Sequence, residues 1–319
     1  MTTKRGLRRL LVAGVVAAAA MACARQAAAQ PSEKTSVRAA YVPAVTWLNA
    51  WVANDTGIFA RHGLEVSFLA VQNISLLPPT LGKQLDLAPA TVVDLIKAAG
   101  AGLDVVAVAG GHSDIEGVIV NSVMARKDSG IKSVKDLKGK VIATPTLGAI
   151  LHVGLLYWLK REGIDPLSIQ AVEVPFPNMP DQLAAGRIDA AEAVQPFVDR
   201  MIAAGHVSLG DQLLHVANPA RSTVWIADRQ WAAANKPTIA KWTASLREAK
   251  DFIDKTPSEA RNVLAKYTKL PPAVVASIPI PFYEASLEPK ELDAWIKVLV
   301  ELGQLPTALD AANLVATVP

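Results

Sequence analysis

The stretch from Thr144 to Gly148 carries the residues best suited to bind a small charged molecule. It has the sequence Thr-Pro-Thr-Leu-Gly, follows the short apolar segment 141–143, and precedes residues 149–162, whose apolar side chains recur at helical spacing. A loop between a strand and a helix N-terminus presents backbone N–H groups to an anion, here beside the hydroxyls of Thr144 and Thr146. The stretch therefore predicts anion binding without catalysis. The alternative is an ordinary turn in which a threonine caps the helix.

Other candidate residues follow other predicted strands. Thr91 opens a helix in the first half of the chain, so its hydroxyl either reaches the same ligand or simply caps that helix. The ring of Trp47 either lies flat on an apolar ligand or packs in the core. His112 ends a strand and offers a pH-sensitive hydrogen bond, with a solvated loop as the alternative. Gln195 and Phe197 lie at the end of a later strand. The amide of Gln195 and the ring of Phe197 are the last of these candidate ligand contacts.

The sequence offers no catalytic motif. Residues 111–115 resemble a nucleophile elbow, but Ile115 stands where the glycine two positions after the serine is required. The remaining histidines have no histidine partner four residues away and no acidic cluster. We therefore predict no catalytic residue, no metal site and no cofactor, and we expect that the protein is not an enzyme.

The first 29 residues are typical of a secretory signal peptide. Four basic residues within positions 4–9 precede an apolar run from Leu10 to Met21, and Ala27-Ala28-Ala29 forms a small-residue cleavage site. The apolar run is shorter than the roughly 20 residues of a membrane-spanning helix. We predict export to the periplasm with a mature chain that starts near Gln30. A lipoprotein anchored through Cys23 is the alternative.

Charge and cysteine content exclude several classes of protein. The chain has 32 basic and 29 acidic residues, but five of the basic ones precede Gln30, which leaves 27 against 29 and a net charge of −2. The basic balance therefore belongs to the leader, and no nucleic-acid surface is predicted. Cys23 is the only cysteine, so the mature chain has no disulfide and no thiol chemistry.

Strands and helices alternate along most of the chain. Strands are predicted at 37–42, 64–70, 85–88 and 105–109, with helical segments at 46–59, at 76–82 and through Ala99. A second set follows the strand-like run 117–124, an isolated strand lies at 222–227, and the residues beyond Pro237 are helical. The alternation predicts two α/β lobes with parallel sheets. Lobe 1 comprises residues 36–119 and 222–319, lobe 2 comprises residues 120–221, and the ligand cleft lies between them.

Three motifs in this order resemble those of one family of transport proteins. They are Gly57–Val66, Ser133–Val141 and Leu183–Ala190, the last followed by Gln195-Pro196. Together they are similar to the nitrate/sulfonate/taurine family of ABC-transporter substrate-binding proteins. The resemblance implies an α/β bilobal periplasmic-binding-protein fold of type II, with two crossover strands and closure around a solute. It also implies a monomer that docks on an ABC permease in the inner membrane.

The resemblance also indicates which loops contact the ligand, without identifying that ligand. The family's contact loops map onto residues 41–47, 88–91, 110–114, 144–148 and 195–197. Seven tryptophans in the chain, and no lysine or arginine in these loops, favour a small organic anion, either a sulfonate or an aromatic or aliphatic carboxylate. Other functions on this fold are a thiamin-pyrimidine or menaquinone-precursor enzyme and a ligand-sensing partner of a signalling receptor. The predicted ligand contacts are Trp47, Ala90, Thr91, His112, Thr144, Thr146, Leu147, Gly148, Gln195 and Phe197.

Overall fold

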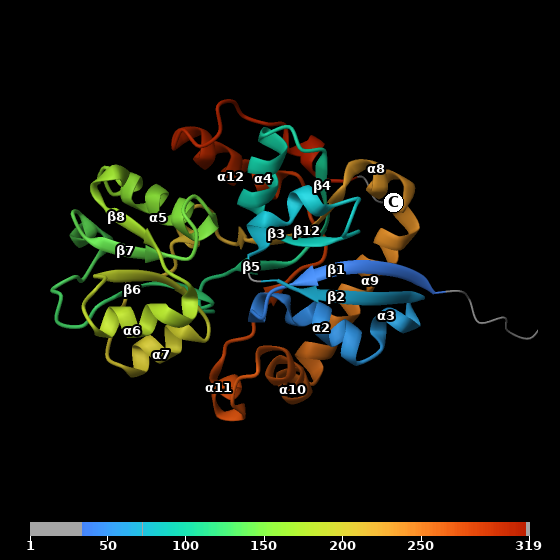
Figure 1. Cartoon of the computed structure of the whole chain (residues 1–319), viewed down its shortest axis with the longest axis horizontal. Helices are drawn as coiled ribbons and strands as arrows, with labels where there is room; N and C mark the ends of the chain where they lie inside the picture. The colour runs from blue at the N-terminus through green and yellow to red at the C-terminus, as the bar shows by residue number, and fades with distance from the viewer. Residues whose placement is uncertain (1–33, 72, 317–319) are drawn as a thin grey trace, which may run out of the picture. The chain divides into compact units, whose positions relative to one another are not determined.

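Four small sheets and the helices that cover them make up the structure, a computed structural model that describes residues 34–71 and 73–316 (Figure 1). The predicted signal peptide and Cys23 lie outside the described residues. The chain from Ser36 onward forms one compact unit by its contacts. None of the described helices has both the length and the apolar character that crossing a membrane would require.

The sheets outside residues 121–208 use strands from two distant parts of the chain, residues 35–114 and 220–283. Strand β1 pairs with β2, and a second sheet has the order β3-β12-β4. Strand β12 is antiparallel to both of its neighbours. The prediction of a purely parallel sheet was therefore wrong here, because a strand from the far end of the chain separates β3 from β4. A small sheet has the order β11-β5-β13. The bounds are β1 (Thr35–Tyr41), β2 (Leu64–Ala70), β3 (Ala88–Thr91), β4 (Val105–Gly110), β5 (His112–Asp114), β11 (Ala220–Arg221), β12 (Thr223–Asp228) and β13 (Phe282–Tyr283).

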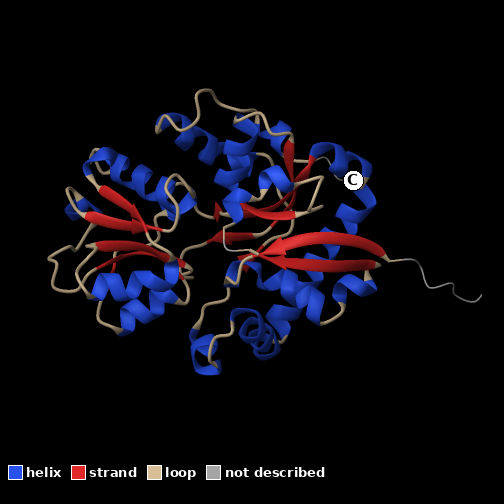
Figure 2. Ribbon diagram, viewed as in Figure 1, coloured by secondary structure: helices blue, strands red, loops and turns tan. Residues whose placement is uncertain are grey.

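The five-stranded sheet lies entirely within residues 121–208 and has the order β10-β6-β9-β7-β8. Strand β7 runs parallel to β8 and β9, whereas β6 is antiparallel to β9. Because side chains alternate along a strand, Ile142 of β7 packs with α5 on one face and Ala143 packs with α6 and α7 on the other. Figure 2 shows these helices on the two faces of the sheet. The bounds are β6 (Asn121–Ala125), β7 (Val141–Thr144), β8 (Gln170–Glu173), β9 (Ala190–Val194), β10 (Val207–Ser208), α5 (Ile150–Arg161), α6 (Met179–Ala184) and α7 (Phe197–Ala203).

The other helices belong to the rest of the chain and follow the prediction in broad outline. The predicted helix at 46–59 is split into a 3₁₀ turn and two short α-helices, and the segment at 76–82 contains only 3₁₀ turns around its two prolines. The strand predicted at 117–124 begins only at Asn121. The bounds are α2 (Leu48–Asp55), α3 (Ile58–Arg61), α4 (Val92–Gly100), α8 (Arg229–Ala234), α9 (Lys236–Lys255), α10 (Pro257–Thr268), α11 (Pro272–Ser277) and α12 (Lys290–Glu301).

Helix α5 packs on more than its own sheet. Leu155 and Leu159 belong to the core of the five-stranded sheet, whereas Ile150 and Val153 belong to a second apolar cluster. That second cluster also contains residues of α4 and α12. Burying both sides of α5 fixes its N-terminal end, and with it the loop after β7, beside α4. The predicted boundaries of the two lobes stay a prediction.

Candidate functional site

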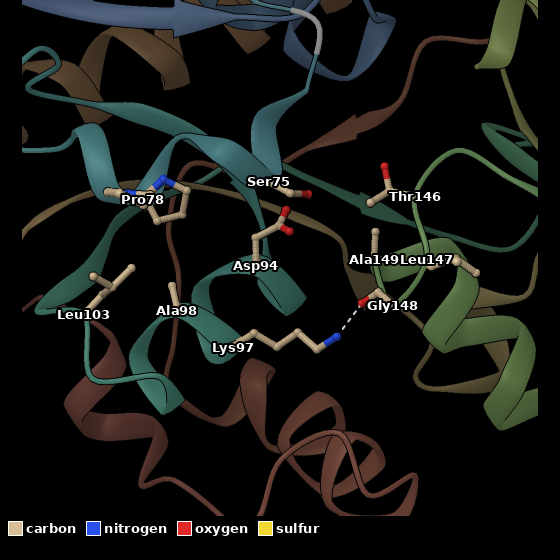
Figure 3. Close-up of a pocket in the computed structure, with 11 residues that line it drawn as sticks. Ser75, Pro78, Asp94, Lys97, Ala98, Leu103, Thr146, Leu147, Gly148 and Ala149 are labelled. Carbon is tan, nitrogen blue, oxygen red and sulfur yellow. Dashed lines mark hydrogen bonds between the residues drawn. The ribbon is translucent and has the colours of Figure 1, made fainter. Parts of the chain in front are cut away.

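The loop before α5 and the side of α4 enclose a pocket of about 300 Å³ (Figure 3). A third wall comes from the 3₁₀ turns that follow β2. Apolar groups dominate the lining, and its charged side chains are Asp94 and Lys97. The lining residues are Ser75, Pro78, Pro79, Asp94, Lys97, Ala98, Leu103, Thr146, Leu147, Gly148 and Ala149.

Lys97 links α4 to the loop. Its ammonium Nζ donates a hydrogen bond of 2.7 Å to the carbonyl oxygen of Gly148. Burial lowers the pKa of Lys97, and the nearby carboxylate of Asp94 opposes that shift. Sequence reasoning missed this residue because it lies two turns into a helix rather than in a loop. Its spacing of three from Asp94, which places the two side chains on the same helix side, is the signal that was available.

The backbone donors of the loop already have partners inside the protein. The N–H of Leu147 donates to Oε1 of Glu173 at 2.8 Å, and the N–H of Gly148 donates to Nδ1 of His152 at 2.9 Å. Burial, and then the charge of Lys97, lower the pKa of His152 to about 4, so the ring is neutral at pH 7 and Nδ1 can accept. An anion that used the Leu147 N–H would therefore have to displace a carboxylate.

Thr91 and Ala90 serve the structure of α4. The Thr91 hydroxyl accepts the N–H of Asp94 at 3.1 Å, and Oδ2 of Asp94 in turn accepts the backbone N–H of Thr91 at 3.1 Å. This reciprocal pair is a capping box, which holds Asp94 at the edge of the pocket. Ala90 is buried in β3. The contacts of Thr91 are therefore those of a residue that caps its helix, which is the alternative stated from the sequence.

Four further predicted contacts lie among buried groups. Trp47 is 1 % exposed and meets Trp225 edge-on with ring centres 5.2 Å apart. Gln195 is also buried, and its amide donates to Asp199 at 2.7 Å. The remaining two are His112 and Thr144, which are described with their partners below.

Thr144 points away from the pocket. It is fully buried and donates to Oε2 of Glu192 at 2.8 Å, while the other oxygen of Glu192 has no hydrogen-bond partner. Burial raises the pKa of the Glu192 carboxyl to about 8. Phe197 is half-buried and stacks on Phe176 with ring centres 6.2 Å apart.

Of the ten predicted contacts, the structure gathers three around the pocket, namely Thr146, Leu147 and Gly148. The other seven do not line it. Leu147 is half exposed at 50 %, so the loop is open to solvent. The loop predicted first from sequence is thus the part of the prediction that lies on a cavity.

A second group of polar side chains is largely shielded from solvent, and we call it the acidic cluster: Asp114, Asn121 and Ser222 are buried, and Asp211 is partly buried. The Asp114 carboxylate accepts from Nδ2 of Asn121 at 2.6 Å and from the hydroxyl of Ser222. Burial and the neighbouring Asp114 raise the pKa of Asp211 to about 8. His112 lies beside the cluster, with Nε2 at 3.5 Å from Oδ2 of Asp114.

The acidic cluster does not carry metal-site geometry. Within the described residues, no group of three or more histidine, cysteine, aspartate or glutamate side chains is placed to hold a metal ion. Nδ1 of His112 is 2.9 Å from the Thr223 hydroxyl, which fixes the ring among neighbouring strands. The cluster ties β5, β6 and the residue between β11 and β12 together.

Known proteins share both the sequence pattern and the fold. Residues 30–269 match the NMT1-like family. A protein of Brachyspira hyodysenteriae, described as an ABC-transporter periplasmic binding protein, is 26% identical over 263 residues, which cover 77% of this chain and 74% of that one. A protein of Haemophilus influenzae described as a thiamine biosynthesis protein is 26% identical over 274 residues, which cover 82% and 77% of the two chains.

Solved structures agree on the fold. The aliphatic sulphonate binding protein SsuA of Escherichia coli superposes with a TM-score of 0.75 at 20% identity, over 89% of this chain and 92% of that one. The nitrate-binding protein NrtA of Synechocystis gives a TM-score of 0.71 at 13% identity, over 88% and 84%. The predicted periplasmic-binding-protein fold and family are confirmed. The chain therefore belongs to the NMT1-like family and is a periplasmic binding protein of the ABC-transport type.

Proposed function

We propose that this protein captures a small organic anion, a sulfonate or an aromatic or aliphatic carboxylate, and delivers it to an ABC permease in the inner membrane. The observation that carries the proposal is the pocket between α4 and the loop before α5, with a lysine ammonium in its wall. A pocket of about 300 Å³ is at the lower end of the usual range for small-molecule sites.

The lining suits a solute that is partly apolar. Most of the wall consists of carbon surface, and the polar groups that could orient a ligand are few. One end of such a solute would be an acid group near Lys97, and the other would lie against the prolines and leucines. The apolar wall residues are Pro78, Pro79, Ala98, Leu103, Leu147 and Ala149.

We further propose that the pocket lies between two lobes, residues 36–119 with 222–319 and residues 120–221, of a monomer that closes around its solute. In support, the pocket takes Lys97 and its neighbours from the first of these segments and Thr146 to Ala149 from the second. The hydrogen bond from Lys97 to Gly148 joins the same two segments. Closure of the two lobes would enclose the captured solute until it is delivered.

An enzyme on the same fold is the second candidate, since one relative is described as a thiamine biosynthesis protein. The hydroxyls in the pocket wall belong to Ser75 and Thr146, and no histidine lines the pocket. A nucleophile would need a base within hydrogen-bond reach. The lining therefore supports binding more than chemistry.

Isothermal titration calorimetry on the mature chain, residues 30–319, tests the proposal. Benzoate, benzenesulfonate, butanesulfonate and nitrate would be titrated after refolding from denaturant to remove any bound molecule. We expect saturable binding of at least one acid with an apolar body, and no binding of nitrate. Binding of nitrate without binding of any organic acid would contradict the proposed class of solute.

A further inference from the structure

Lys97 carries a positive charge that forms no direct ion pair among the described residues, although the Asp94 carboxylate acts on it at longer range. Its hydrogen-bond partner is the uncharged carbonyl of Gly148. Lys97 takes part in none of the ion pairs among the described residues, since no carboxylate oxygen there lies within 4.0 Å of Nζ. An ammonium has three donors, so two remain after the bond to Gly148. The side chain is half-buried, which makes an unpaired charge costly and its pairing with an incoming anion favourable.

The carboxylates near the pocket accept hydrogen bonds from neutral donors and keep their negative charge. Oδ2 of Asp94 accepts both the N–H of Thr91 at 3.1 Å and its hydroxyl at 2.7 Å, and it lies in the first turn of α4, where the helix dipole favours a negative charge. Glu173 is occupied by the N–H of Leu147, and His152 is neutral at pH 7. Among the described residues that line the pocket, Lys97 is the one with a positive charge.

The surroundings of Lys97 indicate what kind of molecule it would hold. In Figure 3 its side chain extends from α4 toward the carbonyl of Gly148, so that Nζ lies between the two walls of the pocket. The rest of the lining is mostly apolar. Because Asp94 already places one negative charge beside this single cation, a solute with one negative charge would meet less repulsion than a solute with two.

We propose that Lys97 is the specificity-determining residue of the pocket: its ammonium binds the acid group of the solute while it keeps its contact with Gly148. The inference rests on the proposed function and narrows it to singly charged acids with an apolar body. Because Lys97 also bonds the loop before α5, an acid bound to it would join α4 and that loop through one shared ammonium. Lys97 would then select the solute and couple its capture to closure.

Calorimetry with a charged and an uncharged ligand of the same shape tests the role of Lys97. Benzoate and benzamide, and benzenesulfonate and benzenesulfonamide, would be titrated into wild type, Lys97→Met, Lys97→Gln and Lys97→Arg. Lys138→Met is the matched control, because Lys138 is exposed, outside the pocket and in none of the ion pairs of the described residues. Thermal unfolding of each variant shows whether it is folded.

We expect Lys97→Met and Lys97→Gln to bind the acid about ten- to a hundred-fold more weakly, the usual worth of a hydrogen bond to a charged group. Their affinity for the amide should stay within a few-fold of wild type. Lys97→Arg should retain part of the preference for the acid, and Lys138→Met all of it. A role in structure alone would weaken acid and amide alike.

The outcomes separate this inference from the function on which it rests. If wild type binds an acid and the Lys97 variants keep the preference for acid over amide, the inference is wrong and the proposed function stands. If wild type binds none of the acids, the proposed class of solute fails and the role of Lys97 fails with it. If Lys97→Met and Lys97→Gln lose the preference for acid over amide while Lys138→Met keeps it, the result supports the proposed function and the role of Lys97.

Discussion

The pocket at α4 and the acidic cluster are two polar regions with opposite surroundings. The pocket is open, its loop residue Leu147 is 50 % exposed, and its cation has only a carbonyl for a partner. The acidic cluster is closed, and its Asp114 carboxylate is fully buried and bonded to Asn121. Polar residues therefore line an open pocket in one region and hold strands together in the other.

The difference shows that position at a strand end does not by itself make a ligand contact. Both Thr144 and Thr146 lie at the end of β7, two residues apart, yet Thr144 turns inward to Glu192 while Thr146 lines the pocket. What separates them is the packing that covers each side of the chain. On the inner side, burial raises the pKa of the Glu192 carboxyl, whereas on the outer side Thr146 lines the open pocket.

The largest effect that we predict is a loss of stability as pH rises from about 6.5 to 8. Burial raises the pKa of Glu192 from 4.5 to about 8, and burial and Asp114 raise that of Asp211 from 3.8 to about 8. A carboxyl that keeps its proton only when folded stabilises the fold less as pH rises from its unfolded toward its folded pKa. Each group contributes on the order of 1 kcal/mol per pH unit in this window.

His152 acts with the opposite sign in a lower window. Its pKa falls from 6.5 to about 4 on folding, so stability rises with pH between these values and offsets the carboxyls there. Urea unfolding at pH 6.5, 7.25 and 8 measures the predicted fall, which Glu192→Gln should roughly halve because an amide does not titrate. A Glu192→Gln slope equal to that of wild type would show that this carboxyl is already ionised.

The next effect compares the same substitution in the two regions. Asp114→Ala removes the acceptor of the buried donors on Asn121 and Ser222, which should destabilise the fold by about 3 kcal/mol. Asp94→Ala removes a helix-capping partner beside the open pocket, which should cost about 1 kcal/mol. Urea unfolding at pH 7 gives both values. An equal cost for the two variants would remove the contrast between closed and open polar regions.

The smallest effect concerns Glu173, the carboxylate on the N–H of Leu147. Glu173 is exposed, so Glu173→Gln should change stability by less than about 0.5 kcal/mol. Removing this negative charge near the pocket should also strengthen benzoate binding about two-fold, as expected for a solvent-screened charge. Calorimetry on Glu173→Gln measures the affinity, with Asp165→Asn as an exposed control. Weaker binding than wild type would show that Glu173 supports the loop.

Sequence patterns located the loop at Thr146 to Gly148 because its signals are local: a short apolar strand, small residues and a helix start. The fold could be predicted for the same reason, since most strands and helices show their own hydrophobic periodicity. The antiparallel position of β12 was not accessible, because the pairing joins Val224 to Ala90, residues far apart in the chain.

The roles of side chains in the two polar regions could not be predicted from sequence either, because their surroundings come from residues far apart in the chain. Lys97 lies inside a helix, and only the contact with Gly148 shows that it lines a pocket. Glu192 is set among alanines in β9, with no local mark of the burial that raises its pKa. The sequence allows two interpretations of Trp47, a ligand contact or a core residue. Its partner Trp225 comes from a distant strand, so the sequence does not show the contact.

Hydrogen exchange with and without a bound acid tests the central claim, that solute binds at the pocket and not at the acidic cluster. Backbone exchange would be followed by mass spectrometry on the mature chain, with the panel acid that binds most tightly. We predict slower exchange in peptides covering residues 91–103 and 144–153, and a smaller change in peptides covering 112–122 and 209–222, which contain the proposed lobe boundaries. Slowing confined to the peptides of the acidic cluster would contradict the account.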